Sequence, residues 1–273
     1  MRLGAPVFDA YNNAEEWAAA HKKYGYNAAY CPIGADKLDL KDEYITAAEK
    51  HDIIIAEVGA WSNPMSVNPD NRSKALEHCK TQLHLADEIG AKCCVNIAGN
   101  IEQSPGDPWD GHSPENFTKK AFDLIVETTR DIIDSVNPKR TFYTLEMMPW
   151  MYPYDEDGYL DLIRAIGRKQ FAVHLDVVNI INSPVKYYDT PGVIKSCFAK
   201  LGGYIKSIHV KDIIMPQKMT AHLDEIIPGK GNFCHKTLIE EVKKCDENIP
   251  MMLEHLQTKE EYIEAGEYIK SLF

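Results

Sequence analysis

The chain has 273 residues, of which 44% are hydrophobic and 26% are charged, which is ordinary for a globular protein with a sizeable core. Its formal net charge of −11 argues against a nucleic-acid-binding protein, which needs clustered basic residues, and the short basic runs argue against binding to a membrane surface. No stretch approaches about 18 uninterrupted apolar residues, and the first residues read as a strand, so neither a membrane span nor a signal peptide is expected.

Short β-type runs alternate with amphipathic helical patterns along the chain. Strands are predicted at residues 2–8, 27–30, 53–58, 92–97, 141–146, 171–176, 204–209 and 250–254. Helices are predicted at residues 13–24, 42–51, 70–89, 113–136, 156–168, 190–201, 234–245 and 258–272. Eight such repeats predict parallel strands joined by helical crossovers, and hence an α/β protein made of a single (β/α)8 TIM barrel domain, residues 1–273. An open doubly wound sheet is the alternative, but no Gly-x-Gly-x-x-Gly follows the first strand.

Four predicted strands in the second half of the chain end on side chains that commonly bind metals. These residues are Glu146, Asp176, His209 and Glu254. For any one of them alone, a polar strand end that faces solvent is the simpler interpretation. The carboxyl ends of parallel barrel strands meet at one end of the barrel, however, so the four together predict a metal site. Three carboxylates and one imidazole suit Mn²⁺ best, with Mg²⁺ or Co²⁺ as alternatives and Zn²⁺ less favoured.

The quartet, together with the sequence His-Val-Lys-Asp around His209 and the turn Ile-Pro-Gly-Lys-Gly-Asn at residues 227–232, resembles the xylose-isomerase-like TIM-barrel superfamily. That superfamily includes sugar and sugar-phosphate isomerases and epimerases, inosose dehydratases and endonuclease IV. The resemblance extends over essentially the whole chain and is most specific in residues 141–256. It implies a metal-dependent isomerase or epimerase in which Glu146 and Glu254 bind the ion and also transfer protons, through an enediolate of a sugar-like substrate.

The sequence departs from this pattern at one position. Epimerases related to D-tagatose 3-epimerase carry a histidine three residues after the Asp of the sixth strand, where this chain has Asn179, which cannot transfer a proton at neutral pH. Ketose epimerisation therefore loses weight. Endonuclease IV also fits less well, because it needs several more histidine ligands and the chain is acidic.

Two segments resemble a different branch of the superfamily. The sequences at residues 145–153 and 176–184, with Tyr187 and Tyr188, are similar to catalytic subunits of C-glycoside deglycosidases. That resemblance implies a lyase-type cleavage of a 3-oxo-glycoside, a divalent ion and a small β partner subunit. A barrel that binds a sugar or a metal without turnover is a second alternative, which the retained pair of glutamates disfavours.

Further candidates surround the predicted quartet. Lys211 follows His209 by two residues and so faces the same way, where its charge would assist catalysis; a solvated loop lysine is the equal alternative. Aromatic rings in loops after strands would stack on a substrate, although packing under a loop suits each ring as well. His174 is predicted to be a hydrogen-bonded core histidine. The candidates for substrate binding are Trp61, His112, Trp150, Asn179 and His222, with Trp109 and Tyr152 as further aromatic rings, and the histidines qualify only if their loops fold inward.

The expected partners follow from the same observations. We expect a small carbohydrate substrate, phosphorylated or free, and neither nucleic acid nor membrane. An oligomer is expected, with a small β subunit if the protein is a deglycosidase. Seven cysteines without paired spacing favour reduced thiols and a cytoplasmic location.

Overall fold

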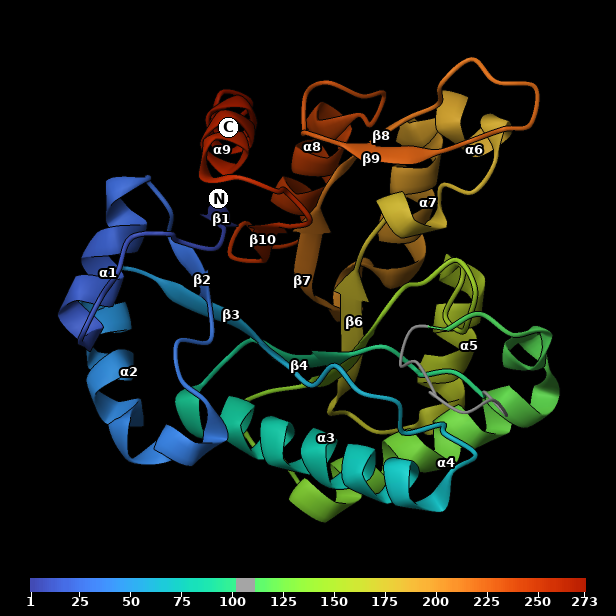
Figure 1. Ribbon diagram of the computed structural model, residues 1–273, viewed down its shortest axis with the longest axis horizontal. Coiled ribbons are helices and arrows are strands. Elements are labelled where there is room, and N and C mark those ends of the chain that lie inside the picture. Colours follow the sequence, from blue (N-terminus) through green and yellow to red (C-terminus); the bar gives the residue numbers. More distant parts are fainter. Residues whose placement is uncertain (102–110) are drawn as a thin grey trace.

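The computed structural model describes residues 1–101 and 111–273. Eight parallel strands close into a barrel in the spatial order β1-β10-β7-β6-β5-β4-β3-β2 (Figure 1). This closure confirms the predicted (β/α)8 barrel and excludes the open sheet. The barrel strands are β1 (Arg2–Gly4), β2 (Ala28–Tyr30), β3 (Ile54–Gly59), β4 (Cys93–Asn96), β5 (Tyr143–Glu146), β6 (Phe171–Leu175), β7 (Ile205–Val210) and β10 (Pro250–Leu253).

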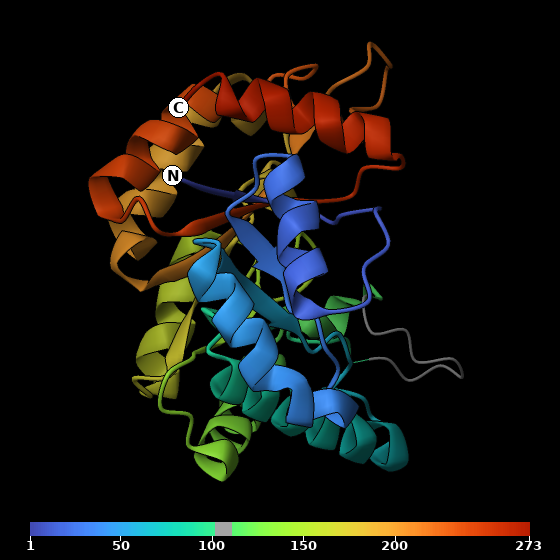
Figure 2. The same cartoon turned by 90° about the vertical axis from the view of Figure 1, so that its left-hand side faces the viewer.

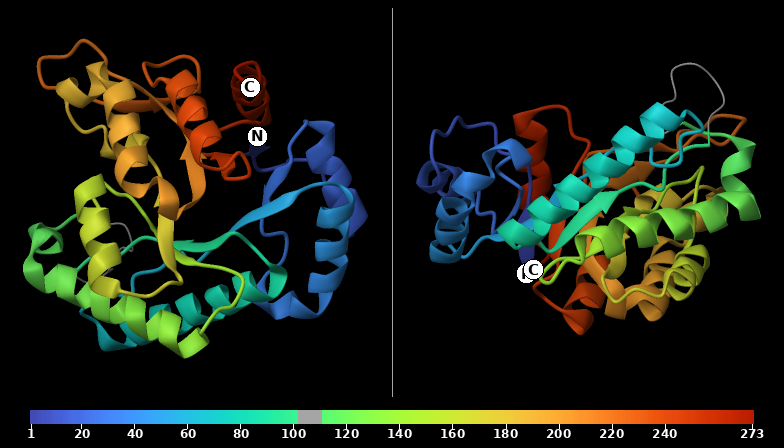
Figure 3. Two further views of the ribbon diagram at one scale, coloured as in Figure 1. Left: turned by 180° about the vertical axis from the view of Figure 1, so that it is seen from behind. Right: turned by 90° about the horizontal axis from the view of Figure 1, so that it is seen from below.

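Helices surround the barrel on the outside, as Figures 2 and 3 show from three further sides. They are α1 (Ala14–Lys23), α2 (Lys41–Lys50), α3 (Pro69–Ile89), α4 (Lys119–Val136), α5 (Glu156–Ile166), α6 (Pro184–Tyr188), α7 (Thr190–Leu201), α8 (His235–Cys245) and α9 (Lys259–Lys270). Short 3₁₀ turns lie at η1 (Ala35–Leu40), η2 (Pro114–Phe117), η3 (Val178–Ile180) and η4 (Gly202–Tyr204). No helix among the described residues is long and apolar enough to cross a membrane.

Local chemistry explains where the elements begin and end. The Asn13 side chain accepts a hydrogen bond at the start of α1, and Gly90 ends α3 in the left-handed conformation, both as expected. The predicted helix at 113–136 is instead divided, because Thr118 has extended backbone and caps α4 anew after η2. The first strand stops at Gly4, which packs so closely on β2 that a Cβ there would lie 2.4 Å from the Ala28 carbonyl oxygen.

The core has two parts. A large apolar cluster fills the layer between strands and helices; within it Trp17 of α1 is 1% exposed and contacts the Tyr44 ring of α2 edge-on. A small cluster of Ala28, Ala56 and Met252 lies on the strands themselves. Tyr30, which is partly buried, packs against this second cluster.

The long connection after β7 contains a hairpin that the sequence did not indicate. Strands β8 (Asp212–Ile214) and β9 (Asp224–Ile226) pair antiparallel, and Figure 1 shows them beside α6 and α7. The Asp212 carboxylate accepts hydrogen bonds from the backbone N–H groups of four residues at both ends of this excursion. These residues are Ile213, Gly229, Gly231 and Phe233, at 2.8, 2.8, 3.0 and 2.9 Å. A Cβ at Gly231 would lie 2.3 Å from Asp212 Oδ1, so this turn needs glycine.

Candidate metal centre

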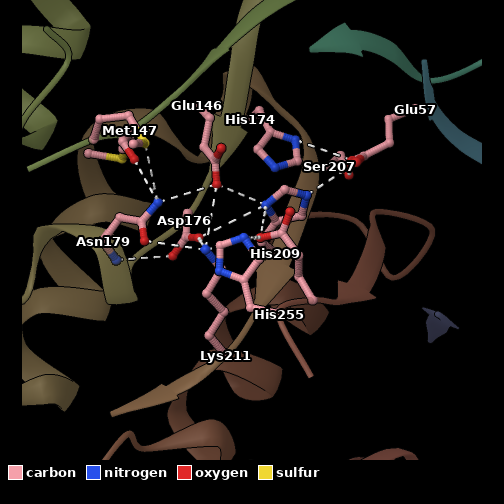
Figure 4. Close-up of polar contacts among 12 residues, drawn as sticks. Glu57, Glu146, Met147, His174, Asp176, Asn179, Ser207, His209, Lys211 and His255 are labelled. Carbon is pink, nitrogen blue, oxygen red and sulfur yellow. Dashed lines mark hydrogen bonds and ion pairs between the residues drawn. The ribbon is translucent and has the colours of Figure 1, made fainter. Parts of the chain in front are cut away.

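The four predicted ligands converge at the carboxyl end of four neighbouring strands. Glu146 ends β5, Asp176 follows β6, His209 lies near the end of β7, and Glu254 follows β10. One donor atom from each residue lies within 4.8 Å of the donor atoms of the other three. Figure 4 shows Glu146, Asp176 and His209 of this group in close-up.

The imidazole of His209 stands at the middle of the group. Its Nδ1 lies 2.9 Å from Glu146 Oε1, 3.0 Å from Glu254 Oε2 and 3.9 Å from Asp176 Oδ2. Nδ1 is therefore the ring nitrogen that faces the carboxylates, and Nε2 points away from them (Figure 4).

Lys211 lies inside the site. Its side chain is 2% exposed, and Nζ lies 2.8 Å from Asp176 Oδ2 and 3.0 Å from Glu254 Oε2. The ammonium also donates to Asn179 Oδ1 at 3.3 Å. Asn179 in turn donates to Glu146 Oε1 at 3.3 Å and to the Met147 carbonyl oxygen at 3.0 Å. This burial does not match the solvated lysine that was the alternative interpretation.

The two glutamates of the site are in different electrostatic states. Burial raises the pKa of Glu146 to about 7, although His209 and Lys211 oppose the shift. Burial acts on Glu254 in the same direction, but there His209 and Lys211 prevail and hold its pKa well below the ordinary value. Burial alone would lower the pKa of Lys211, yet the surrounding carboxylates, Asp176 first, raise it well above its ordinary value.

The donor set fits a divalent ion that prefers oxygen. Asp176 Oδ2 and Glu254 Oε2 are buried and find no hydrogen bond of good geometry among the described residues. Buried carboxylate oxygens are costly unless they are charge-paired or bind an ion, and here the one ammonium of Lys211 lies 2.8 and 3.0 Å from these two oxygens. Three carboxylates and one imidazole nitrogen suit Mg²⁺ or Mn²⁺, and the residues that would hold the ion are the four predicted ones.

A second layer of polar residues lies beneath the quartet, and the sequence reasoning missed its central member. Glu57 of β3 is 2% exposed and lies 3.1 Å from His209 Nε2, while Ser207 Oγ donates to its other oxygen at 2.9 Å. The His174 ring packs against His209 with centroids 4.1 Å apart. His174 is fully buried, as expected of a core histidine, but its ring nitrogens find no hydrogen bond among the described residues. A lone carboxylate in the apolar run Ile-Ile-Ile-Ala-Glu-Val was the available signal for Glu57.

A cavity of about 740 Å³ opens from the metal site toward solvent. Three of the predicted substrate-binding residues line it: Trp61, Trp150 and Asn179. Within the described part of the chain, the lining includes neither His112 nor His222; both are exposed, and the His112 ring lies beside Trp150. Tyr152 packs against Phe122, and Trp109 lies outside the described residues.

The cavity lining combines polar and apolar side chains. Its polar lining comes from Glu146, Glu254, Asn179, Asn182, Glu225 and His255. Its apolar lining comes from Trp61, Met148, Pro149, Trp150, Val178, Ile181, Ile213 and Leu223. The hairpin contributes Glu225 of β9, whose carboxylate lies 2.9 Å from His255 Nδ1 and 3.6 Å from Lys211 Nζ. His255 directly follows Glu254 and has φ 59°, a left-handed conformation that is uncommon for a residue other than glycine.

Comparison with solved structures shows the same fold in several enzymes. A probable 3-DHS dehydratase, AsbF, involved in petrobactin synthesis in Bacillus anthracis is 15% identical, with a TM-score of 0.74 over 99% of this chain and 98% of that chain. The 3-keto-D-glucoside 4-epimerase YcjR from E. coli is 13% identical, with a TM-score of 0.66 over 99% of both chains. A xylose isomerase-like TIM barrel protein from Mycobacterium smegmatis, in complex with magnesium, is 16% identical, with a TM-score of 0.67 over 99% of this chain and 96% of that chain.

At these identities the likeness establishes the fold alone, and comparison with curated proteins gave no match. The sequence itself is more specific, because the family model described as xylose isomerase-like TIM barrel matches residues 17–272. This family includes sugar epimerases and isomerases. The match spans nearly the whole chain and includes all four candidate ligands, so the protein belongs to the xylose isomerase-like TIM barrel family.

Proposed function

We propose that this protein is a divalent-metal-dependent isomerase or epimerase that acts on a sugar or sugar-like substrate by proton transfer between Glu146 and Glu254. The observation that carries the proposal is the placement of these two carboxylates on either side of His209 Nδ1, 2.9 and 3.0 Å away. Simple sugar binding does not need an ion-binding pair of acids at the bottom of a cavity. Epimerisation through an enediolate uses such a pair, because a proton leaves one face of a carbon and is returned to the other face.

The residues divide the work as follows. Glu254, whose pKa lies well below its ordinary value, is ionised and accepts the proton next to the substrate carbonyl. Glu146, whose pKa burial raises to about 7 in the absence of the ion, is the group that returns a proton to the substrate. A divalent ion held by the quartet supplies Lewis-acid stabilisation of the negative charge that develops on oxygen. Lys211 adds positive charge on the same side, and Asn179 orients a substrate hydroxyl.

The experiment begins with metal analysis of the purified protein. The protein is then stripped with EDTA, reloaded with Mn²⁺, Mg²⁺ or Co²⁺, and incubated in D₂O with ketoses and with 3-oxo-glucosides. We expect metal-dependent incorporation of deuterium next to the carbonyl, detected by NMR, together with a new epimer or isomer. A protein that binds no divalent ion, or that exchanges protons equally well after EDTA treatment, would refute the proposal.

A second candidate function has one specific observation in its favour. The eight apolar side chains of the cavity lining suit a substrate with an apolar group attached to its sugar, since buried hydroxyls facing them would lose their hydrogen bonds. Lyase-type cleavage of a 3-oxo-C-glycoside, with a flat aglycone against these side chains, uses the same proton abstraction.

An aryl 3-oxo-C-glucoside separates the two functions. Chromatography separates the products of the reaction. Release of the aglycone supports cleavage, whereas a new sugar epimer that keeps its aglycone supports isomerisation. Trp150→Ala is expected to weaken binding of the aryl substrate about tenfold or more and to leave a methyl 3-oxo-glucoside unaffected. Equal losses for both substrates would remove the argument from the apolar lining. Co-purification of a small partner chain would also favour the deglycosidase.

A further inference from the structure

Glu57 is a buried carboxylate on a barrel strand that carries none of the four candidate metal ligands. It lies on β3, across the barrel from the strands that carry the quartet, and is 2% exposed. A buried charge is costly unless it is paired and hydrogen-bonded. Glu57 takes no part in the proton transfers proposed above, and its side chain lies on the far side of His209 from the other acids (Figure 4).

The contacts of Glu57 identify what it does. One carboxylate oxygen, Oε1, lies 3.1 Å from His209 Nε2, and the other, Oε2, accepts a hydrogen bond from Ser207 Oγ at 2.9 Å. His174 Nδ1 lies 3.5 Å from Oε2 and makes no hydrogen bond to it, so His174 contributes packing against the imidazole instead. The carboxylate is thus aimed at one atom, the ring nitrogen of His209 that faces away from the quartet.

A carboxylate accepts hydrogen bonds and cannot donate them, so Nε2 must carry a proton to bond to Glu57. Nδ1 lies 2.9 Å from Glu146 Oε1, so without an ion either ring nitrogen can hold a proton. A divalent ion that binds Nδ1 displaces any proton there, and the neutral imidazole then keeps its single proton on Nε2. Nδ1 is the atom that lies among Glu146, Asp176 and Glu254. We infer that Glu57 is a positioning residue that fixes His209 in the Nε2–H tautomer and so presents Nδ1 to a divalent ion. The inference rests on the proposed metal-dependent function.

Three variants test this assignment by metal binding, independently of any substrate. Glu57→Leu removes the acceptor, Glu57→Gln keeps an amide oxygen of similar reach, and Ser207→Ala removes the neighbouring bond to Glu57 without touching His209. Mn²⁺ binding is measured by isothermal titration calorimetry, and folding is checked by circular dichroism. We expect the affinity to fall about 10- to 100-fold in Glu57→Leu and less in Glu57→Gln. In Ser207→Ala we expect a change below about threefold.

A second experiment measures the tautomer of His209 directly in the wild-type protein. With ¹⁵N-labelled histidine and Mg²⁺ bound, long-range ¹H–¹⁵N NMR is expected to show one histidine protonated at Nε2 and not at Nδ1, with a proton protected from exchange by its bond to Glu57. His209→Gln assigns the signal. This readout decides the question even if Glu57→Leu fails to fold.

The outcomes are distinguishable from failure of the proposed function. A wild-type protein that binds no divalent ion overturns both. Wild-type binding with an unchanged affinity in folded Glu57→Leu, or a proton found on Nδ1, overturns the role of Glu57 alone. A loss in Ser207→Ala as large as in Glu57→Leu also overturns it, because the effect would then come from general disruption of the core.

Discussion

The two halves of the barrel mouth use the same strand–helix unit but end in different chemistry. Strands β5, β6, β7 and β10 end in the quartet, whereas the residues after β1 and β3 are the buried alanines Ala5 and Ala60. Strand β4 ends on Asn96, a neutral amide that accepts a hydrogen bond from the Ser62 backbone N–H. The scaffold therefore does not dictate the charge. One half concentrates ionisable groups so that they compensate one another. The other half, which we call the neutral half after its uncharged strand ends, provides packing, although β3 also carries Glu57 two positions before its last residue.

The largest expected effect comes from removing charge in the quartet. Glu146→Gln and Glu254→Gln are each expected to lower metal-dependent proton exchange by about 10³-fold, because an amide cannot accept or return a proton. The matched control is Glu156→Gln on α5, whose carboxylate contacts Ser196 and Lys200 and is not part of the cavity lining. Turnover is measured for each variant, and the metal content and the folding of each variant are checked separately. Retention of activity in both quartet variants would refute the mechanism.

Stability offers the next contrast between the halves. Lys211→Met leaves Asp176 and Glu254 without their cation and is expected to cost about 3–5 kcal/mol in the free energy of unfolding of the metal-free protein. Trp17→Ala in the neutral half opens a cavity and is expected to cost a similar 3–5 kcal/mol.

The two losses are expected to respond differently to an ion. Excess Mg²⁺ restores most of the stability of Lys211→Met, because a divalent ion neutralises the same carboxylates. It stabilises Trp17→Ala no more than the wild type, by about 2.7 kcal/mol at a hundred times its dissociation constant. Urea unfolding with and without Mg²⁺ measures both. Equal responses in the two variants would mean that Lys211 does not share its carboxylates with the ion.

The smallest expected effect is a pH dependence in the neutral half. Burial lowers the pKa of His21 below its ordinary value of 6.5, although its Nδ1 lies 2.9 Å from the Trp17 carbonyl oxygen. As the pH falls below about 6.5, the unfolded chain binds a proton that the folded chain resists, so stability decreases. His21→Gln is expected to flatten this part of the stability curve, measured by urea unfolding between pH 5 and 8. A curve as steep as that of the wild type would assign the effect to other groups.

Most of the fold could be predicted because its signals are local. Apolar runs and capping residues such as Asn13 and Gly90 act within a few positions, and all eight predicted strands have counterparts in the barrel. The hairpin β8–β9 was missed because the segment is held by Asp212, whose carboxylate binds a backbone N–H group 21 residues further along the chain. α6 was missed because a helix of 5 residues leaves almost no periodic pattern.

The site could be predicted only in part, for a related reason. Strand-end positions indicated which residues would meet, and the structure brings Glu146, Asp176, His209 and Glu254 together. The role of Glu57 depends on contact across the barrel, since it reaches His209 from a strand 152 residues earlier in the chain. No spacing rule encodes that distance.

The four backbone hydrogen bonds to Asp212 have a consequence for how such a barrel acquires new substrates. Both ends of the excursion between Ile213 and Phe233 are fastened to one carboxylate next to Lys211. The intervening segment, which includes Glu225 and Leu223 of the cavity lining, can therefore be lengthened, shortened or exchanged while the residues on either side keep their places. Because Asp212 and Gly231 fix both ends of this segment, its sequence can change during evolution and alter which substrates are recognised. The residues of the candidate metal centre need not change with it.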